Sequence, residues 1–269
     1  MRTEANREKL PPISNTPPGN SLTGKFRFLM RSLLDMQVAS VLHHLRPWLE
    51  KRSGSLLEVG CGAQPYRHLV PEACRYTGLD WEQAEANFKY RLPDTVYYDG
   101  ERFPFADGSF DNLFHTEVLE HIYHPGQFLA ECRRVLKPEG TMFFTVPFQA
   151  RYHYIPHDFF RYTPAALERM LTEAGFCNIE IRPRGSDITV AAYKNISIIY
   201  RWLQSGPVGM IAGILLAPVA LPILIVGHLS LHSPLGSPDD CLGYTVTADA
   251  SRETRIETTY SCPLLSGKF

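Results

Sequence analysis

The sequence lacks the features that mark several common classes of protein. Its 27 basic and 28 acidic residues give the 269-residue chain a formal net charge of -1, and no basic stripe indicates a nucleic-acid partner. Its six cysteines form no C-x-x-C pair and no other metal-ligand spacing. The N-terminal segment contains no apolar stretch of the kind found in secretory signals. We therefore expect reduced thiols, no metal site and a cytoplasmic location.

The two N-terminal segments differ in their patterning. Residues 1–22 are polar and rich in proline, so they are predicted to be disordered. From Lys25 to Lys51, apolar residues recur at spacings near three and four, which predicts a helix with a break indicated at Pro47. We expect this helix to cover one face or edge of a sheet.

A short apolar run followed by two glycines lies at the centre of the chain's organisation. Leu56 to Val59 predicts a buried strand, and Gly60 and Gly62 permit a tight turn whose N–H groups can approach a ligand. A helix is expected to begin near position 66. A dinucleotide fingerprint would need a third glycine at position 65, which is Pro65 here. These residues alone leave an ordinary glycine turn open as an alternative.

Acidic residues end the next two predicted strands. Asp80 closes the strand that begins at Tyr76, and a carboxylate in that place can accept hydrogen bonds from both ribose hydroxyls of an adenosine. Capping of a following helix is the alternative for Asp80. Enzymes that use NAD place an acid there too, so Asp80 indicates an adenosine ligand without choosing between cofactors. Asp99 ends a third strand, which begins at Val96.

Three further motifs follow in order: Phe103 to Asp111, Glu117 to His121, and Arg134 to Gly140. Together with Glu58-x-Gly-x-Gly, they resemble the class I S-adenosylmethionine-dependent methyltransferases of the type 11-like branch, over about residues 54–183. The resemblance implies a Rossmann-like α/β fold, with a seven-stranded sheet and helices on both faces. It also implies S-adenosyl-L-methionine as the cofactor. The usual Leu-Lys-Pro-Gly-Gly turn of that branch carries Glu139 here.

The resemblance implies a cofactor site at the ends of the first four strands. The methionine end would lie at the glycine turn, the ribose at Asp80, the adenine at Asp99, and the sulfonium near His115. His121, by contrast, is expected to be a structural helix residue. The cofactor-binding residues implied in this way are Glu58, Gly60, Gly62, Asp80, Asp99, Gly100 and His115.

The stretch from Pro147 to Pro164 is dense in histidine, tyrosine, arginine and phenylalanine, and it follows the fifth predicted strand. Active sites of α/β folds lie at such strand ends. A base is needed if the methyl acceptor is a protonated nucleophile. We predict His157, oriented by Asp158, as this base, with His153 as the second candidate. The alternative is an ion pair between Asp158 and Arg161 that only fixes the loop.

A long apolar insertion separates the sixth and seventh predicted strands, which are expected to pair antiparallel. Residues 207–231 are almost free of charge and are long enough to span a bilayer by the usual rule of about 20 apolar residues. The chain must return to the same sheet, however, and Pro218 and Pro222 are expected to break the run. We therefore predict a broken helical hairpin that dips into one leaflet. A buried helix pair or an oligomer interface is the alternative.

These observations divide the chain and assign it a function. Residues 1–22 form a disordered N-terminus, 23–187 with 241–250 a methyltransferase domain, 188–240 a membrane-associating insertion, and 251–269 a flexible tail. The predicted activity is methylation of a small or lipid-linked acceptor, at oxygen, with peripheral contact at the inner face of the membrane through residues 188–231. A catalytically silent membrane-attached scaffold and an NAD(P)-dependent oxidoreductase are the alternatives.

Overall fold

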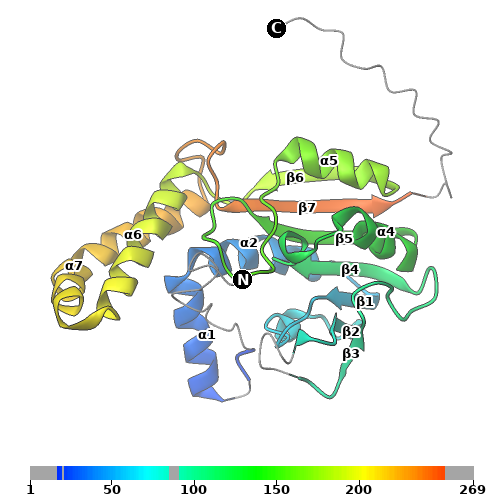
Figure 1. Ribbon diagram of the computed structural model, residues 1–269, viewed down its shortest axis with the longest axis horizontal. Coiled ribbons are helices and arrows are strands. Elements are labelled where there is room, and N and C mark those ends of the chain that lie inside the picture. Colours follow the sequence, from blue (N-terminus) through cyan, green and yellow to red (C-terminus); the bar gives the residue numbers. More distant parts are fainter. Residues whose placement is uncertain (1–16, 20, 85–90, 252–269) are drawn as a thin grey trace, which may run out of the picture.

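The computed structural model describes residues 17–19, 21–84 and 91–251, and its centre is a seven-stranded sheet of order β3-β2-β1-β4-β5-β7-β6 (Figure 1). The first five strands are parallel, and β7 runs antiparallel to both of its neighbours. The predictions of a seven-stranded Rossmann-like sheet and of an antiparallel last strand are thereby confirmed. The strands are β1 (Gly54–Val59), β2 (Cys74–Trp81), β3 (Thr95–Tyr98), β4 (Phe110–Thr116), β5 (Leu136–Pro147), β6 (Phe176–Pro183) and β7 (Gly243–Ala250).

Helices cover both faces of the sheet, as expected. Successive strand residues point to opposite faces, so Leu56 packs with α2 (Met36–Leu49) whereas Leu57 joins the core under α4 (Pro125–Val135) and α5 (Pro164–Glu173). The same alternation divides Phe143 from Phe144 in β5. All four of these strand side chains are buried. The apolar runs of the strands therefore reflect burial on both faces.

The N-terminal helical region is divided differently from the prediction. It forms α1 (Leu22–Leu34) and α2, which meet at Asp35, while Pro47 lies inside α2. Asp35 makes the break because its carboxylate accepts a hydrogen bond from the N–H of Gln37 at 3.1 Å and so caps α2. The disorder predicted for residues 1–22 falls mostly outside the described residues, but α1 already begins at Leu22. The predicted tail likewise lies beyond the described chain, which ends at residue 251.

Two expected helices are single turns in the structure. The chain after the glycine turn forms only η2 (Arg67–Leu69), and the chain after β4 forms only η3 (Leu119–His121). Pro71 follows η2 closely, and a proline cannot continue the hydrogen bonding of a helix. Glu117 has a left-handed φ of 53°, which interrupts the chain before η3. Within the described residues, the connections after β1 and β4 therefore begin without a long helix.

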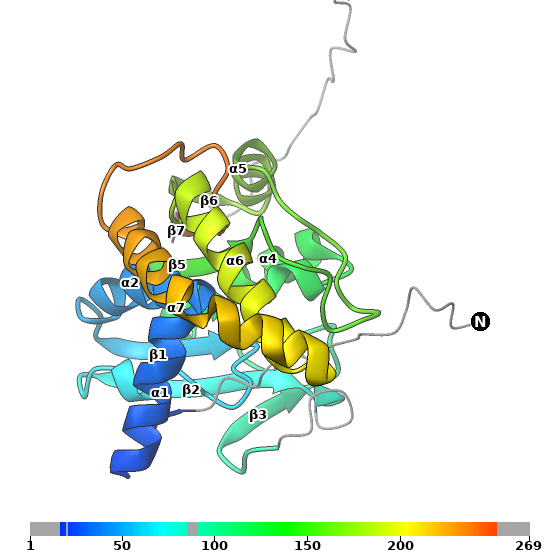
Figure 2. The same ribbon diagram turned by 90° about the vertical axis from the view of Figure 1, so that its left-hand side faces the viewer.

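The apolar insertion is a helical hairpin of α6 (Asp187–Leu203) and α7 (Gly206–Leu231). It leaves the sheet after β6 and returns at β7, where the N–H of Arg184 donates to the carbonyl of Gly243 at 2.8 Å. The hairpin therefore begins and ends at the carboxyl edge of the parallel strands. Figures 1 and 2 show it extending from that edge beside α1. The N–H of Leu242 donates to the carbonyl of Arg184 at 3.1 Å and closes the hairpin's base.

The prediction that prolines break the apolar run is wrong, because α7 is continuous through Pro218 and Pro222 over 26 residues. A helix of that length measures about 39 Å, which exceeds the thickness of a bilayer's hydrocarbon core. Among the described residues, α7 is the helix that is long and apolar enough to cross a membrane. Only 6% of its most apolar window is buried within the structure.

Candidate active site

The two glycines after β1 occupy the left-handed conformation that the turn requires. Gly60 has φ 64° and Gly62 has φ 55°. A Cβ on Gly60 would lie 2.6 Å from Cγ2 of Val118, which is far inside van der Waals contact. The turn after β1 therefore packs against the turn after β4, and glycine at position 60 is needed for this contact as well as for its φ.

Glu58 lies buried at the end of β1, next to this turn. The hydroxyl of Tyr76 donates a hydrogen bond to its carboxylate. Burial, together with the charge of Asp80, raises the pKa of Glu58 to about 8 in spite of that hydrogen bond. The carboxyl is consequently protonated at neutral pH until a positive charge is brought to it.

Asp80 joins the end of β2 to the glycine turn. One carboxylate oxygen accepts from the N–H of Gly62 at 2.9 Å, and the other accepts from the N–H of Trp81 at 2.8 Å. The side chain is buried at the carboxyl edge, beside the turn that is predicted to hold the cofactor. Its predicted contact with ribose remains a prediction. The bond to Trp81 also shows that the carboxylate stabilises its own strand end.

The predicted adenine end lies after β3. Asp99 is exposed and accepts a hydrogen bond from the N–H of Glu101 at 2.9 Å, which closes a turn. Gly100 has φ 95°, and a Cβ there would lie 3.1 Å from Nε1 of Trp81. The indole of Trp81 therefore lies against Gly100, so the ends of β2 and β3 meet where the adenine is expected.

His115 differs from its predicted place because its side chain belongs to the core. The ring is fully buried and stacks on Phe144 with centroids 4.6 Å apart, and it meets the edge of Phe128. Burial lowers its pKa to about 3, so the imidazole is neutral. In the alternation of β4, position 115 faces the helices α4 and α5. Only the backbone of His115 is left to approach a cofactor at the edge.

The loop after β5 is organised by Asp158, which pairs with Arg161 and His153. Both guanidinium nitrogens of Arg161 donate to its carboxylate, at 2.6 and 2.8 Å, and Nδ1 of His153 lies 3.1 Å from it. Although burial raises it, these hydrogen bonds hold the pKa of Asp158 below its usual range. The expectation that Asp158 orients His157 is not met. The arrangement follows the alternative, in which an ion pair fixes the loop.

His157 nevertheless lies at the predicted cofactor edge. Its ring meets the edge of Trp81 with centroids 5.8 Å apart, and its carbonyl accepts a hydrogen bond from Nδ1 of His121 at 2.6 Å. Because Trp81 follows Asp80 directly, the loop after β5 reaches across to the end of β2. The two candidate bases, His153 and His157, thus both lie on a loop that covers the carboxyl edge.

Two polar groups that the sequence analysis did not assign are buried at this edge. Glu120 is fully buried, and neither of its oxygens has a hydrogen-bond partner among the described residues. Burial, with the charge of Glu117, raises its pKa well above the ordinary value. Burial also lowers the pKa of the neighbouring His121 to about 4. The sequence does not reveal this pair, because it predicts His121 only as a structural residue of a helix.

The second unassigned group is Arg184, which is fully buried after β6. Its guanidinium donates to Glu117 at 2.7 Å, to the hydroxyl of Ser40 at 3.0 Å and to the carbonyl of Val146 at 3.2 Å. These bonds tie the turn after β4, the helix α2 and the end of β5 to the base of the hairpin. No periodic or motif signal in the sequence marks this position.

Comparison with known proteins assigns the central part of the chain to a family. Residues 57–144 match the family described as methyltransferase domain. The phthiotriol/phenolphthiotriol dimycocerosates methyltransferase of Mycobacterium tuberculosis is 35% identical over 109 residues, which are 38% of this chain and 40% of that protein. The human thiol S-methyltransferase TMT1B is 35% identical over 100 residues, 34% of this chain and 41% of that protein. The chain thus matches about two fifths of the length of these relatives.

The fold is shared more widely. A SAM-dependent methyltransferase from Thermotoga maritima superposes with a TM-score of 0.51 at 13% identity, covering 86% of this chain and 96% of that one. At that identity the likeness concerns the fold. The Rossmann-like architecture is confirmed, and the family match supports the predicted methyltransferase domain, with S-adenosyl-L-methionine as its cofactor, over residues 57–144.

Proposed function

We propose that this chain, which belongs to the class I S-adenosylmethionine-dependent methyltransferases, methylates an oxygen of a lipid-linked acceptor at a membrane surface. The observation that carries the proposal is the hairpin α6–α7, which contains the exposed apolar helix and whose base lies at the same edge of the sheet as the candidate site. A relative named for phthiotriol and phenolphthiotriol dimycocerosates supports an acceptor of this kind.

The exposed surface of α7 argues for a nonaqueous neighbour. Val208 is 82% exposed and Leu215 is 73% exposed, and polar side chains do not shield them. Contiguous apolar patches of this extent mark interaction surfaces in soluble proteins. The exposed apolar side chains of the hairpin are Val208, Met210, Ile211, Ile214, Leu215, Leu216, Val219, Leu221, Ile225 and Val226 of α7 with Tyr200, Trp202 and Leu203 of α6.

Hydrogen bonds connect the segment between α7 and β7 to the loop after β5, which carries the candidate bases. The backbone N–H groups of Phe148 and Gln149 donate to the carbonyl of Leu242 at 2.9 and 3.1 Å. The amide of Gln149 also donates to Asp240 at 2.7 Å. An acceptor whose chain lies in a lipid surface around α7 would therefore present its head group beside the loop that carries the candidate bases.

The protein's main contribution to methyl transfer is to position the donor and the acceptor. The sulfonium already activates the methyl carbon, so holding donor and acceptor in line provides most of the acceleration. A hydroxyl acceptor also needs a base for its proton. We propose His157 for this role, because its ring lies against Trp81 at the end of β2. Asp158 would then act on the loop, through Arg161 and His153.

The cofactor is tested by calorimetric titration of S-adenosylmethionine and S-adenosylhomocysteine into the full chain, with NAD as a control ligand. Asp80→Ala is expected to bind both about tenfold or more weakly, because it loses the proposed acceptor of the ribose hydroxyls. Absence of binding to a folded wild-type sample would reject the enzyme and favour the silent scaffold. Binding of NAD instead would favour the oxidoreductase.

The membrane contact is tested by flotation with phospholipid vesicles. The wild type is expected to float with them, whereas the double variant Leu215→Glu with Val219→Glu is expected to stay in the aqueous fraction. Both positions are exposed, so the fold is not disturbed. Leu235→Glu, which introduces one glutamate at a 48% exposed position outside the helices, is the control, and it is compared also with the single variant Leu215→Glu. If wild type and double variant float alike, the hairpin is not the attachment.

The acceptor atom is tested with radiolabelled methyl donor and model acceptors that carry a lipid chain with a terminal hydroxyl or thiol. Incorporation into the hydroxyl compound supports the proposal, and its loss in His157→Ala with retained cofactor binding supports the base. Exclusive labelling of the thiol compound would move the activity to sulfur.

A further inference from the structure

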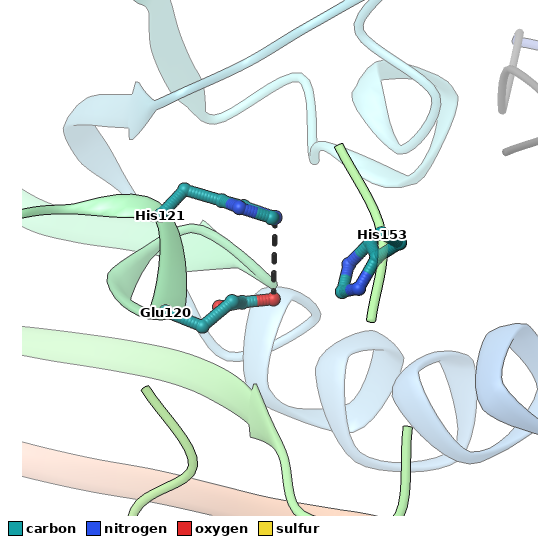
Figure 3. A group of neighbouring side chains, drawn as sticks. All are labelled: Glu120, His121 and His153. Atoms are coloured by element: carbon teal, nitrogen blue, oxygen red, sulfur yellow. Dashed lines mark ion pairs between the residues drawn. The ribbon is translucent and has the colours of Figure 1, made fainter. Parts of the chain in front are cut away.

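We propose that Glu120, His121 and His153 form a binding site for one divalent transition-metal ion of the zinc or iron(II) type. One ligand atom from each side chain lies within 4.8 Å of the other two. Figure 3 shows the three side chains turned toward one another, two from η3 and one from the loop after β5. The inference concerns binding and does not depend on the proposed methyl transfer.

The buried carboxyl of Glu120 must either keep a proton or acquire a positive partner. Both of its oxygens are inaccessible to solvent and have no hydrogen-bond partner among the described residues. A carboxylate buried in that state is strongly unfavourable unless it is paired with a positive charge or protonated. Arg161 is the nearby cation, but both of its terminal nitrogens already donate to Asp158. Nε2 of His121 lies 3.7 Å from the carboxylate, which is too far for a hydrogen bond.

The hydrogen bonds of the two histidines fix which nitrogen can bind a metal. Nδ1 of His121 faces the carbonyl of His157 at 2.6 Å, and a carbonyl only accepts, so this nitrogen carries the proton. Nε2 of His121 is then a lone-pair donor beside Glu120, with no partner among the described groups. Nδ1 of His153 likewise faces two acceptors, the carbonyl of Arg151 at 2.9 Å and the carboxylate of Asp158 at 3.1 Å. Its lone pair therefore lies on Nε2.

This pattern is the usual second shell of a metal-binding histidine. Such histidines donate their other N–H to a carboxylate or a backbone carbonyl, which fixes the tautomer and the ring orientation. Both occur here, a carbonyl for His121 and a carbonyl with the Asp158 carboxylate for His153. Asp158, which the loop ion pair explains only in part, thereby gains a second role.

The donor set selects the class of ion. Two imidazole nitrogens and one carboxylate oxygen suit zinc, iron(II) and related ions rather than magnesium or calcium, which prefer oxygen ligands. Ligand atoms bonded at about 2.0–2.2 Å to one tetrahedral ion lie roughly 3.4 Å apart. The observed 3.7 Å between Glu120 and His121 is close to this, and the ligand atom of His153 lies within 4.8 Å of both.

A bound ion would link the loop after β5 to the turn after β4. It would neutralise the buried carboxylate and join η3 to the loop at His153, across 32 residues of sequence. Three protein ligands leave a coordination position for water or an acceptor oxygen, as in catalytic zinc sites. The distance in sequence also explains why no metal-ligand spacing marks the site.

The test uses the untagged full chain, stripped with a chelator and titrated with Zn²⁺ alone in a calorimeter. The expected result is one ion per chain and a rise in melting temperature on binding. Glu120→Gln and His153→Ala are each expected to weaken binding at least a hundredfold. His124→Ala changes a nearby exposed histidine outside the cluster and is expected to bind like the wild type.

Circular dichroism establishes that each variant is folded. If Glu120→Gln fails to fold, His153→Ala on the half-buried loop decides the question alone. Absence of saturable binding to the wild type would overturn the proposal. So would undiminished binding in His153→Ala, because the ion would then be held by other groups, such as the exposed thiol of Cys177.

Discussion

Binding of the cofactor should release a proton from Glu58. The buried carboxyl of the free protein has a pKa of about 8, so at pH 7 about nine molecules in ten carry the proton. S-adenosylmethionine brings a sulfonium and an ammonium group to the turn beside it. A nearby positive charge favours the carboxylate, and we expect its pKa to fall below 6 in the complex.

The magnitude follows from linkage. At pH 7 the complex should release about 0.9 proton per ligand bound, and the affinity should rise by about tenfold per pH unit between the pKa of the complex and about 8. The same raised pKa also makes the folding stability of the ligand-free chain depend on pH. Because the folded chain keeps this proton up to about pH 8 while the unfolded chain loses it near 4.5, the stability contributed by Glu58 falls as the pH rises through that range.

The assay is calorimetric titration at pH 7 in buffers that differ in their enthalpy of ionisation, where the slope of the observed enthalpy counts released protons. Glu58→Gln keeps the shape of the side chain and cannot release this proton, so its slope should be close to zero. A slope near zero in the wild type, or an equal release from both proteins, would refute the reasoning.

Three substitutions test other parts of the structure. Gly60→Ala adds a Cβ at 2.6 Å from Val118 and costs about 1 kcal/mol for a non-glycine residue in the left-handed conformation, so cofactor binding should fall more than tenfold. Adding Val118→Ala should restore part of the binding. Unchanged binding in Gly60→Ala would contradict the packing argument. Asp111→Asn loses the hydrogen bond from Lys137 that, ahead of other groups, lowers the Asp111 pKa to about 2; denaturant titration should show less than about 1 kcal/mol of lost stability at pH 7, vanishing as the pH falls from 4 toward 2. Arg184→Ala removes a fully buried guanidinium and should lower the free energy of unfolding by about 3 kcal/mol, and a loss below 1 kcal/mol would mean that its bonds are not needed.

The sheet could be predicted because its signals are local. Apolar runs such as Leu56 to Val59, and the acid near the end of the second strand, lie within short windows of sequence and occur in a known order. Helix lengths were predicted less well. A periodic pattern from Lys25 to Lys51 does not reveal that Asp35 caps a second helix. Pro218 lies within a long helix although its nitrogen cannot donate a backbone hydrogen bond.

The candidate site could be predicted only where a residue's role follows from its strand end. The places of Gly60 and Asp80 at the edge follow from the order of the strands. The direction in which His115 points depends on the register of β4, and the partner of Asp158 depends on how a loop folds back on itself. Neither can be read from spacing alone, and the same holds for Glu120 and His153.

The chain leaves the sheet for the hairpin and returns to it at one place, where backbone hydrogen bonds join Arg184 to Leu242 and Gly243. A segment whose ends meet can be lengthened, exchanged or removed while the neighbouring strands keep their register, as in domains inserted into surface loops. If the hairpin attaches the chain to a membrane as proposed, attachment and chemistry lie in separate segments, and a methyltransferase without the hairpin would gain the attachment by acquiring this one insertion.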